Sequence, residues 1–162
     1  MGAVYGVFTP VGQAARVMQP LILGPFAVTR DGSLQPREAA ASPALRFSWR
    51  GRRCEAALAP DGVHLAAIAG RIPSTAEPGA DRATAFETVA TLPRSLPPGW
   101  RVRLLPDHRI RLEAATNTAA APTATSVIAA MVRFALAMDP YLDRLETACG
   151  GASSGTLNTW PG

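Results

Sequence analysis

Alternation of apolar and polar residues between positions 45 and 65 is the feature that most limits how this 162-residue chain can fold. A two-residue loop at Gly51-Arg52, where glycine suits a type II′ turn, pairs Trp49 with Cys54. A turn at 60–62 then pairs Leu58 with Val63. Both pairings keep one set of side chains on one face of the sheet: Leu45, Phe47, Trp49, Cys54, Ala56, Leu58, Val63 and Leu65. The segment 45–69 therefore predicts a three-strand antiparallel meander.

The stretch GWRVRLLPDHRIRLEA, residues 99 to 114, alternates in the same way and predicts a two-strand hairpin. A two-residue loop would set Arg103 against Ile110 and mismatch the apolar faces, so we expect a three-residue loop at 106–108. This register pairs Leu104 with Ile110 on the inner face. It pairs these residues on the outer face: Arg103 with Arg111, Arg101 with Glu113, and Arg109 with Leu105.

Two further segments have helical spacing. Asp81 suits the N-cap of a helix over 81–92, which Pro93 and Pro97 end. Its expected apolar positions are Ala85, Phe86, Val89 and Ala90. A longer helix over 127–148, capped by Thr125 or Ser126, has a stripe broad enough to lie across a sheet: Val127, Ile128, Met131, Phe134, Ala135, Met138, Leu142 and Leu145. Asp139-Pro140 predicts either a kink or the start of a second helical segment.

These elements predict an α+β fold, an antiparallel sheet covered by two helices, the C-terminal one long. An extra hairpin precedes the meander, with Phe26 and Val28 before a turn at 30–33 and Leu34 after it. We expect a loose arm over 1–20, one α+β domain over 21–149, and a flexible Gly/Ser-rich tail over 150–162.

Charge and cysteine content indicate the type of genome that encodes the chain and the cellular compartment in which it folds. All 16 cations are arginine, which with the abundant alanine is typical of a GC-rich, bacterial genome. Positive charge is concentrated between 42 and 111, whereas 112–162 is acidic. Cys54 and Cys149 are too few for a disulfide framework, and the apolar N-terminal segment lacks an early basic residue and is broken by prolines. We therefore expect a cytoplasmic protein, neither exported nor membrane-spanning.

The arginine-rich hairpin has two interpretations. An opposed Arg103–Arg111 pair is unfavourable unless solvent, Glu113 or an acidic side chain from elsewhere offsets it, and the outer face is then only a solvated surface. Alternatively it is a surface for an anion or an acidic partner, because guanidinium groups bind carboxylates and phosphates in a bidentate manner. The candidate binding residues are Arg101, Arg103, His108, Arg109 and Arg111. We also expect solvated positions for Glu87, Asp143 and Glu146 on the helices and for Arg50, Arg52 and Arg53 at the first turn of the meander. The alternative for the three turn arginines is that they extend the basic surface, if the two hairpins are neighbours.

The sequence offers little to support catalysis. His64 and His108 lie in different hairpins without ligand-spaced cysteines or carboxylates, which argues against a metal site. Cys54 points into the core, and no G-x-S-x-G motif exists. We expect no cofactor and no enzymatic activity; a hydrolase or transferase would have to use Asp107 and His108 as a base pair. Nucleic acid is disfavoured because Trp100 points inward instead of lying among the outer arginines.

The succession of meander (45–69), proline-ended helix (81–92), hairpin (100–114) and long closing helix (126–148) resembles the type III secretion chaperone-like fold. The hairpin followed by a small-residue connector into VIAAMVRFALAMDPYLDRLE carries most of the likeness. The resemblance implies a small homodimer without enzymatic activity that holds an extended segment of a partner protein against its sheet.

The sequence therefore favours a non-enzymatic, dimeric protein-binding domain whose partner is another protein or an acidic segment, with a second copy of the chain as a further partner. The alternative is a domain that binds an anion or a small acidic ligand through Arg103, Arg109 and Arg111.

Overall fold

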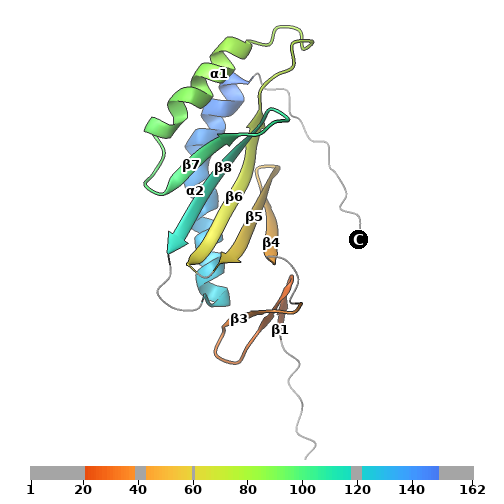
Figure 1. Cartoon of the computed structure of the whole chain (residues 1–162), viewed down its shortest axis with the longest axis vertical. Coiled ribbons are helices and arrows are strands. Elements are labelled where there is room, and N and C mark those ends of the chain that lie inside the picture. The colour runs from red at the N-terminus through yellow and green to blue at the C-terminus, as the bar shows by residue number, and fades with distance from the viewer. Residues whose placement is uncertain (1–20, 39–42, 60, 118–121, 150–162) are drawn as a thin grey trace, which may run out of the picture.

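The computed structural model describes residues 21–38, 43–59, 61–117 and 122–149. The expected arm (1–20) and the expected tail (150–162) fall outside these ranges. The fold is α+β, as predicted, with two antiparallel sheets and two helices, the C-terminal one long (Figure 1).

The larger sheet has five strands in the order β4-β5-β6-β8-β7. Its strands are β4 (Ala44–Trp49), β5 (Arg52–Ala59), β6 (Gly62–Arg71), β7 (Trp100–Leu104) and β8 (Arg109–Asn117). The predicted meander and hairpin join into one sheet because β6 pairs with β8, for example Leu65 with Ala114. The hairpin therefore joins the sheet through its second strand, β8, and its first strand, β7, lies at the edge.

At the first turn of the meander the loop lies one residue earlier than predicted, which shifts the β4–β5 register by two residues. Trp49 pairs with Arg52, and Phe47 pairs with Cys54, so the loop is Arg50-Gly51. Both loop residues have positive φ, 49° and 73°, which is the type I′ geometry and not the predicted II′. A slip of two residues preserves the face of every side chain, so the predicted inner face is nevertheless correct.

The other two registers are confirmed. Leu58 pairs with Val63 across the β5–β6 turn. In the second hairpin Leu104 pairs with Ile110 and Arg103 with Arg111, so the loop has the predicted three residues. Its last residue, His108, has φ 63°, a left-handed conformation that histidine tolerates better than most residues and that three-residue hairpin loops require.

Both predicted helices form. Helix α1 (Arg82–Thr91) is capped by Asp81 as expected, and the chain continues into a 3₁₀ turn at Leu92–Arg94. Helix α2 (Ala124–Ala148) starts earlier than predicted, because Thr123 and Ser126 form a reciprocal capping box. Pro140 lies inside α2 and does not begin a second segment, which corrects one of the two expectations for that position.

Helix α2 lies across one face of the five-stranded sheet and forms the core with it (Figure 1). The buried side chains of α2 are Val127, Ala130, Phe134, Ala135, Met138, Leu142 and Leu145. Four residues expected on the apolar sides are instead exposed: Phe86, Ala90, Leu104 and Ile128. Ile128 lies on the flank of the stripe and Leu104 at the end of an edge strand, where less of the fold covers them.

The N-terminal hairpin is present and has one more strand than predicted. Its strands are β1 (Leu21–Leu23), β2 (Phe26–Val28) and β3 (Leu34–Pro36), in that spatial order. Phe26 is fully buried in the common core. The carbonyl of Gly32 accepts a hydrogen bond from the N–H of Ala124, which joins this small sheet to the start of α2.

Candidate functional site

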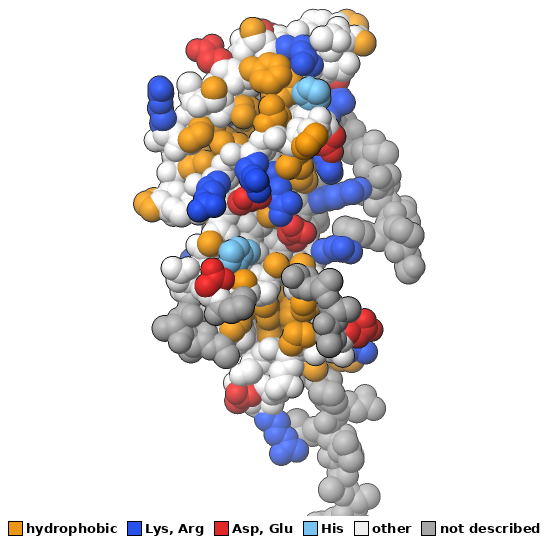
Figure 2. Space-filling model, in the orientation of Figure 1, with side chains coloured by type: hydrophobic (Ala, Val, Ile, Leu, Met, Phe, Trp, Pro, Cys, Tyr) orange, Lys and Arg blue, Asp and Glu red, His pale blue; other side chains and the backbone are white. Residues whose placement is uncertain are grey.

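The candidate site is the face of the five-stranded sheet that points away from α2, here called the open face (Figure 2). The strand registers place its side chains in rows across the sheet. One row contains Arg46, Glu55, Ala66, Glu113 and Arg101, and the next contains Ser48, Arg53, Ile68, Arg111 and Arg103. Charged side chains form a band across the face, with apolar surface on both sides (Figure 2).

Two hollows lie on the open face because small residues occupy its middle. One, of about 320 Å³, is lined by Ala57, Ala66 and Ala115 together with Gly99, His64 and Arg101, among others. The other, of about 220 Å³, is lined by Ala66, Ile68 and Leu105 together with Arg46, Arg53 and Arg109, among others. Arg111, Glu55 and Ala66 line both hollows and form the boundary between them.

That boundary is an ion pair across a strand. The Nη2 of Arg111 on β8 donates to the Oε1 of Glu55 on β5 at 2.6 Å, and β6 lies between them. Ala66, the β6 residue in that part of the face, has no side chain large enough to obstruct the contact. Arg111 Nε also lies 3.2 Å from Glu113 Oε1.

Carboxylates compensate the like charges of Arg103 and Arg111, as the interpretation of the hairpin as a solvated surface required. Glu113 lies 3.7 Å from Arg103 as well, so one carboxylate serves both members of the Arg103–Arg111 pair. Glu55 is the acidic side chain from elsewhere in the fold. These contacts explain why the pair is tolerated. The two rows together contain five arginines and two glutamates.

The remaining candidate residues lie at the end of the hairpin. Arg109 donates from its backbone N–H and its Nε to the carboxylate of Asp107. Burial alone would raise the pKa of Asp107, but these hydrogen bonds and the Arg109 charge outweigh it, so that the pKa is lowered. Asp107 is thus bonded to Arg109, and this arrangement differs from the Asp107–His108 base pair that a hydrolase would require.

His64 lies on the open face opposite Ala57 and Ala115. Its Nε2 is 3.0 Å from Asp61 Oδ1, and this hydrogen bond lowers the pKa of the Asp61 carboxyl. Within the described residues no group of three or more His, Cys, Asp or Glu side chains could hold a metal ion.

Both cysteines are free. Burial raises the pKa of the Cys54 thiol to about 11 and raises that of Cys149 as well. A raised pKa leaves little thiolate at neutral pH, so neither cysteine has the character of a nucleophile.

Sequence reasoning found the β7–β8 side of the open face. On the β4–β5 side it offered Arg53 as an extension of the basic surface but missed Arg46 and Glu55. Arg46 and Glu55 lie in the same row as Glu113 and Arg101, and Arg53 lines the smaller hollow. Alternation alone places these residues on the outer face of the meander. Only the pairing of β6 with β8 brings them next to the hairpin.

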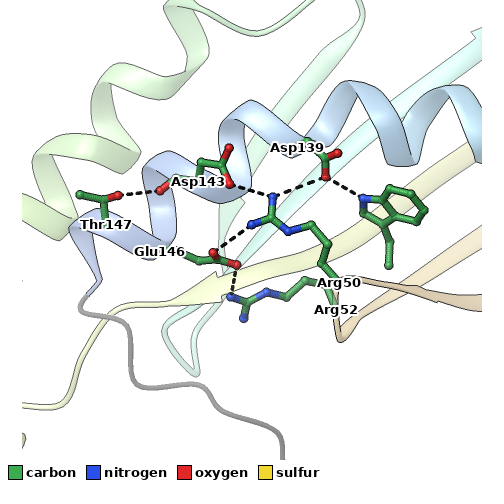
Figure 3. Close-up of polar contacts among 7 residues, drawn as sticks. Arg50, Arg52, Asp139, Asp143, Glu146 and Thr147 are labelled. Atoms are coloured by element: carbon green, nitrogen blue, oxygen red, sulfur yellow. Dashed lines mark hydrogen bonds and ion pairs between the residues drawn. The ribbon is translucent and has the colours of Figure 1, made fainter.

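A second charged cluster lies at the turn between β4 and β5, where solvated side chains were expected (Figure 3). Arg50 contacts three carboxylates of α2: Asp143 at 2.8 Å, Glu146 at 3.1 Å and Asp139 at 3.5 Å. Arg52 also pairs with Glu146, and Trp49 Nε1 donates to Asp139 at 2.7 Å. Arg50 and Asp143 are exposed, as expected, whereas Arg52 and Glu146 are partly buried. The ion pairs between turn and helix were not predicted, because only the tertiary structure brings the turn to the helix.

No protein-family model, curated protein or solved structure matches this chain. Within the described ranges one helix, Ala124–Ala148, is long and apolar enough to cross a membrane by length and composition alone. Its apolar side supplies much of the core, which accounts for that composition.

Proposed function

We propose that this chain is a non-enzymatic protein-binding domain that holds an extended, acidic segment of another protein on its open face. One observation carries the proposal: a sheet face that the helices do not cover is hollowed by alanines, and its two central rows contain five arginines and two glutamates. An extended segment fits because its side chains alternate, so apolar ones can enter hollows while acidic ones meet guanidinium groups.

The order of elements from β4 to α2 is the order on which the resemblance to the type III secretion chaperone-like fold rests. A chaperone-like role in the cytoplasm is part of the proposal. Two free cysteines are consistent with a reducing compartment.

A small acidic ligand is the second candidate, favoured by the hollow that four arginines line: Arg46, Arg53, Arg109 and Arg111. Its volume of about 220 Å³ is below the ~300–1,000 Å³ of most small-molecule sites. An extended segment can use both hollows together, and for this reason we favour it.

Selection from a random-peptide display library tests the proposal. We expect the enriched peptides to alternate acidic and apolar residues, and to bind with micromolar dissociation constants. The Arg103→Glu/Arg111→Glu variant should bind them at least about 30-fold more weakly, because it replaces attraction by repulsion. Arg30→Glu/Arg37→Glu, exposed on the small sheet, makes the same change in net charge and should alter affinity by less than about twofold.

Enrichment of no peptide, or equal loss of affinity in both double variants, would contradict the proposal. Inorganic phosphate and citrate are titrated in parallel. Saturable binding of either at the same arginines, without any peptide enrichment, would favour the small-ligand candidate instead.

A further inference from the structure

Three large apolar side chains of α2 are exposed in a row. Ile128, Val132 and Leu136 are 46%, 51% and 57% exposed. Residues four positions apart lie on one side of a helix, so these three form a single stripe, here called the helix stripe. They are not part of the buried side of α2, which packs on the sheet. A contiguous apolar row on the surface is typical of a contact with another segment.

The two flanks of α2 are covered to different extents (Figure 1). On the flank toward β7, α1 packs against α2, and the hydroxyl of Tyr141 donates to the carbonyl of Ser95 at 2.8 Å. On the flank toward β4, the β4–β5 turn contacts the C-terminal half of α2 through Arg50. The helix stripe continues this second flank toward the start of the helix, where the described residues leave it exposed.

Strand β4 runs alongside α2 in the same direction. Trp49 Nε1 donates to Asp139. The next residue, Arg50, contacts Asp143, which lies one turn further along the helix (Figure 3). A strand rises about 3.3 Å per residue and a helix about 1.5 Å, so four strand residues match about nine helix residues. Leu45, four residues before Trp49, is therefore level with the helix stripe.

The N-terminal end of the described chain lies close to Leu45. A Cβ atom added to Gly24 would lie 3.0 Å from Leu45 Cδ2, so the β1–β2 turn packs against the start of β4. Leu21 is three residues before Gly24, which places it within about 10 Å of that contact. Leu21 and Ile22 are themselves exposed apolar residues. The N-terminal arm, residues 1–20, therefore joins the fold near the flank of α2 that contains the helix stripe.

We propose that the N-terminal arm binds the helix stripe of the same chain through a short apolar group, Val4, Tyr5, Val7 and Phe8. The twelve residues from 9 to 20 span up to about 40 Å when extended, and the helix stripe is only about 12 Å long, so the arm reaches all of it. Binding removes apolar side chains of both segments from water. The sequence alone predicted a loose arm, because a local pattern does not show a binding surface on a distant element.

The composition of the arm suits an apolar surface. Arg16 is its only charged side chain and lies outside the apolar group, so no charged side chain has to leave water. The C-terminal tail, residues 150–162, is the weaker occupant because it leaves α2 at the other end, about 20 Å past Leu136. Its large apolar side chains are also fewer, Leu157 and Trp160.

The bound arm leaves the open face accessible, since α2 lies on the other side of the sheet. The contact between arm and helix therefore does not depend on the peptide-binding function.

Thiol modification of the full chain tests the contact. In a Cys149→Ser background the remaining native thiol is Cys54, and burial raises its pKa to about 11, so it reacts little. Val132→Cys places a reporter thiol at the centre of the helix stripe. Phe86→Cys places a matched reporter on α1, at an exposed apolar residue outside the stripe. The rate of modification by a maleimide is measured for both reporters.

Charges in the apolar group should expose the helix stripe. Val7→Asp/Phe8→Asp should speed modification of the Val132→Cys thiol at least about tenfold, because the charged arm no longer binds. Val11→Asp/Val17→Asp adds the same charge elsewhere in the arm and should change that rate less than about twofold. The reporter on α1 should keep its rate in both double variants.

Cross-linking in the same background identifies the occupant. Phe8→Cys and Val132→Cys in one chain should be joined by a short bis-maleimide, and the product should migrate as a monomer at every protein concentration from about 1 µM to about 100 µM. Ser153→Cys with Val132→Cys is the matched pair for the C-terminal tail and should link more slowly.

Equal modification of the Val132→Cys thiol with the native and the charged arm would overturn the proposal, since the arm would then not cover the helix stripe. Faster linking of the tail pair than of the arm pair would overturn it in favour of the tail. Protection of that thiol that rises with protein concentration would assign the stripe to a second copy instead. Circular dichroism confirms that each variant is folded before the rates are compared.

Discussion

The two arginine clusters of this molecule contain the same residue type beside hairpin turns, yet the fold uses them differently. The turn arginines, Arg50 and Arg52, meet carboxylates from α2, which lies about ninety residues further along the chain. The face arginines, Arg103 and Arg111, meet Glu113 of their own hairpin and Glu55 of a nearby strand. The first set joins two layers of the fold, whereas the second lies within one layer and points to solvent.

The difference shows that local sequence does not decide whether an arginine is structural or available for binding. The number of carboxylates that the fold places beside an arginine decides which of the two it is. Arg50 alone faces three carboxylates, so the turn arginines are fully compensated. The two central rows of the open face contain more arginines than glutamates, and for that reason we propose that a partner binds there.

The largest effect is expected at the turn. Arg50→Glu removes three ion pairs and adds a fourth carboxylate to the group, which should lower the free energy of unfolding substantially. Arg103→Glu, whose side chain is far more exposed, should cost less than about 0.5 kcal/mol. Urea denaturation of both variants measures the difference.

Arg50→Asn is the matched control at the turn, because asparagine tolerates the positive φ of this position while removing the charge. It should cost less than Arg50→Glu. Equal stability of Arg50→Glu and the wild type would remove the contrast between the two clusters.

A smaller effect is expected from Trp49→Phe. The change keeps an aromatic ring against the core but removes the N–H that donates to Asp139, so we expect a loss of about 1 kcal/mol. Thermal unfolding measures it. In the Arg50→Asn background the loss should differ, because both side chains contact Asp139; strict additivity would show that the two contacts are independent.

The smallest effect concerns Asp107 at the end of the second hairpin. Its folded pKa is below the usual 3.8, so its contribution to stability is present above pH 3.8 and is lost as pH falls through the folded pKa. Arg109→Gln removes the guanidinium and should raise this pKa toward its usual value. An NMR titration of the Asp107 carboxyl follows it, and an unchanged titration would show that Arg109 is available to a partner and not held by its own loop.

Local sequence predicted much of the fold. Alternation assigned the inner and outer faces of all five strands of the large sheet, and face matching selected the three-residue loop at 106–108. Asp81 signalled the start of α1. The prediction failed at Arg50-Gly51, because two registers that differ by two residues bury the same side chains and alternation cannot distinguish them.

Only about half of the candidate site could be predicted from the sequence, because local patterns do not show which distant segments meet. The sequence by itself determined that Arg101, Arg103 and Arg111 share a face, since side-chain direction alternates along any strand. Only the tertiary structure decided that β6 pairs with β8, which brings Glu55 to Arg111, and that the β4–β5 turn reaches α2, which brings Arg50 to its carboxylates. Both contacts join segments more than fifty residues apart, and such contacts depend on how layers pack, which no local pattern encodes.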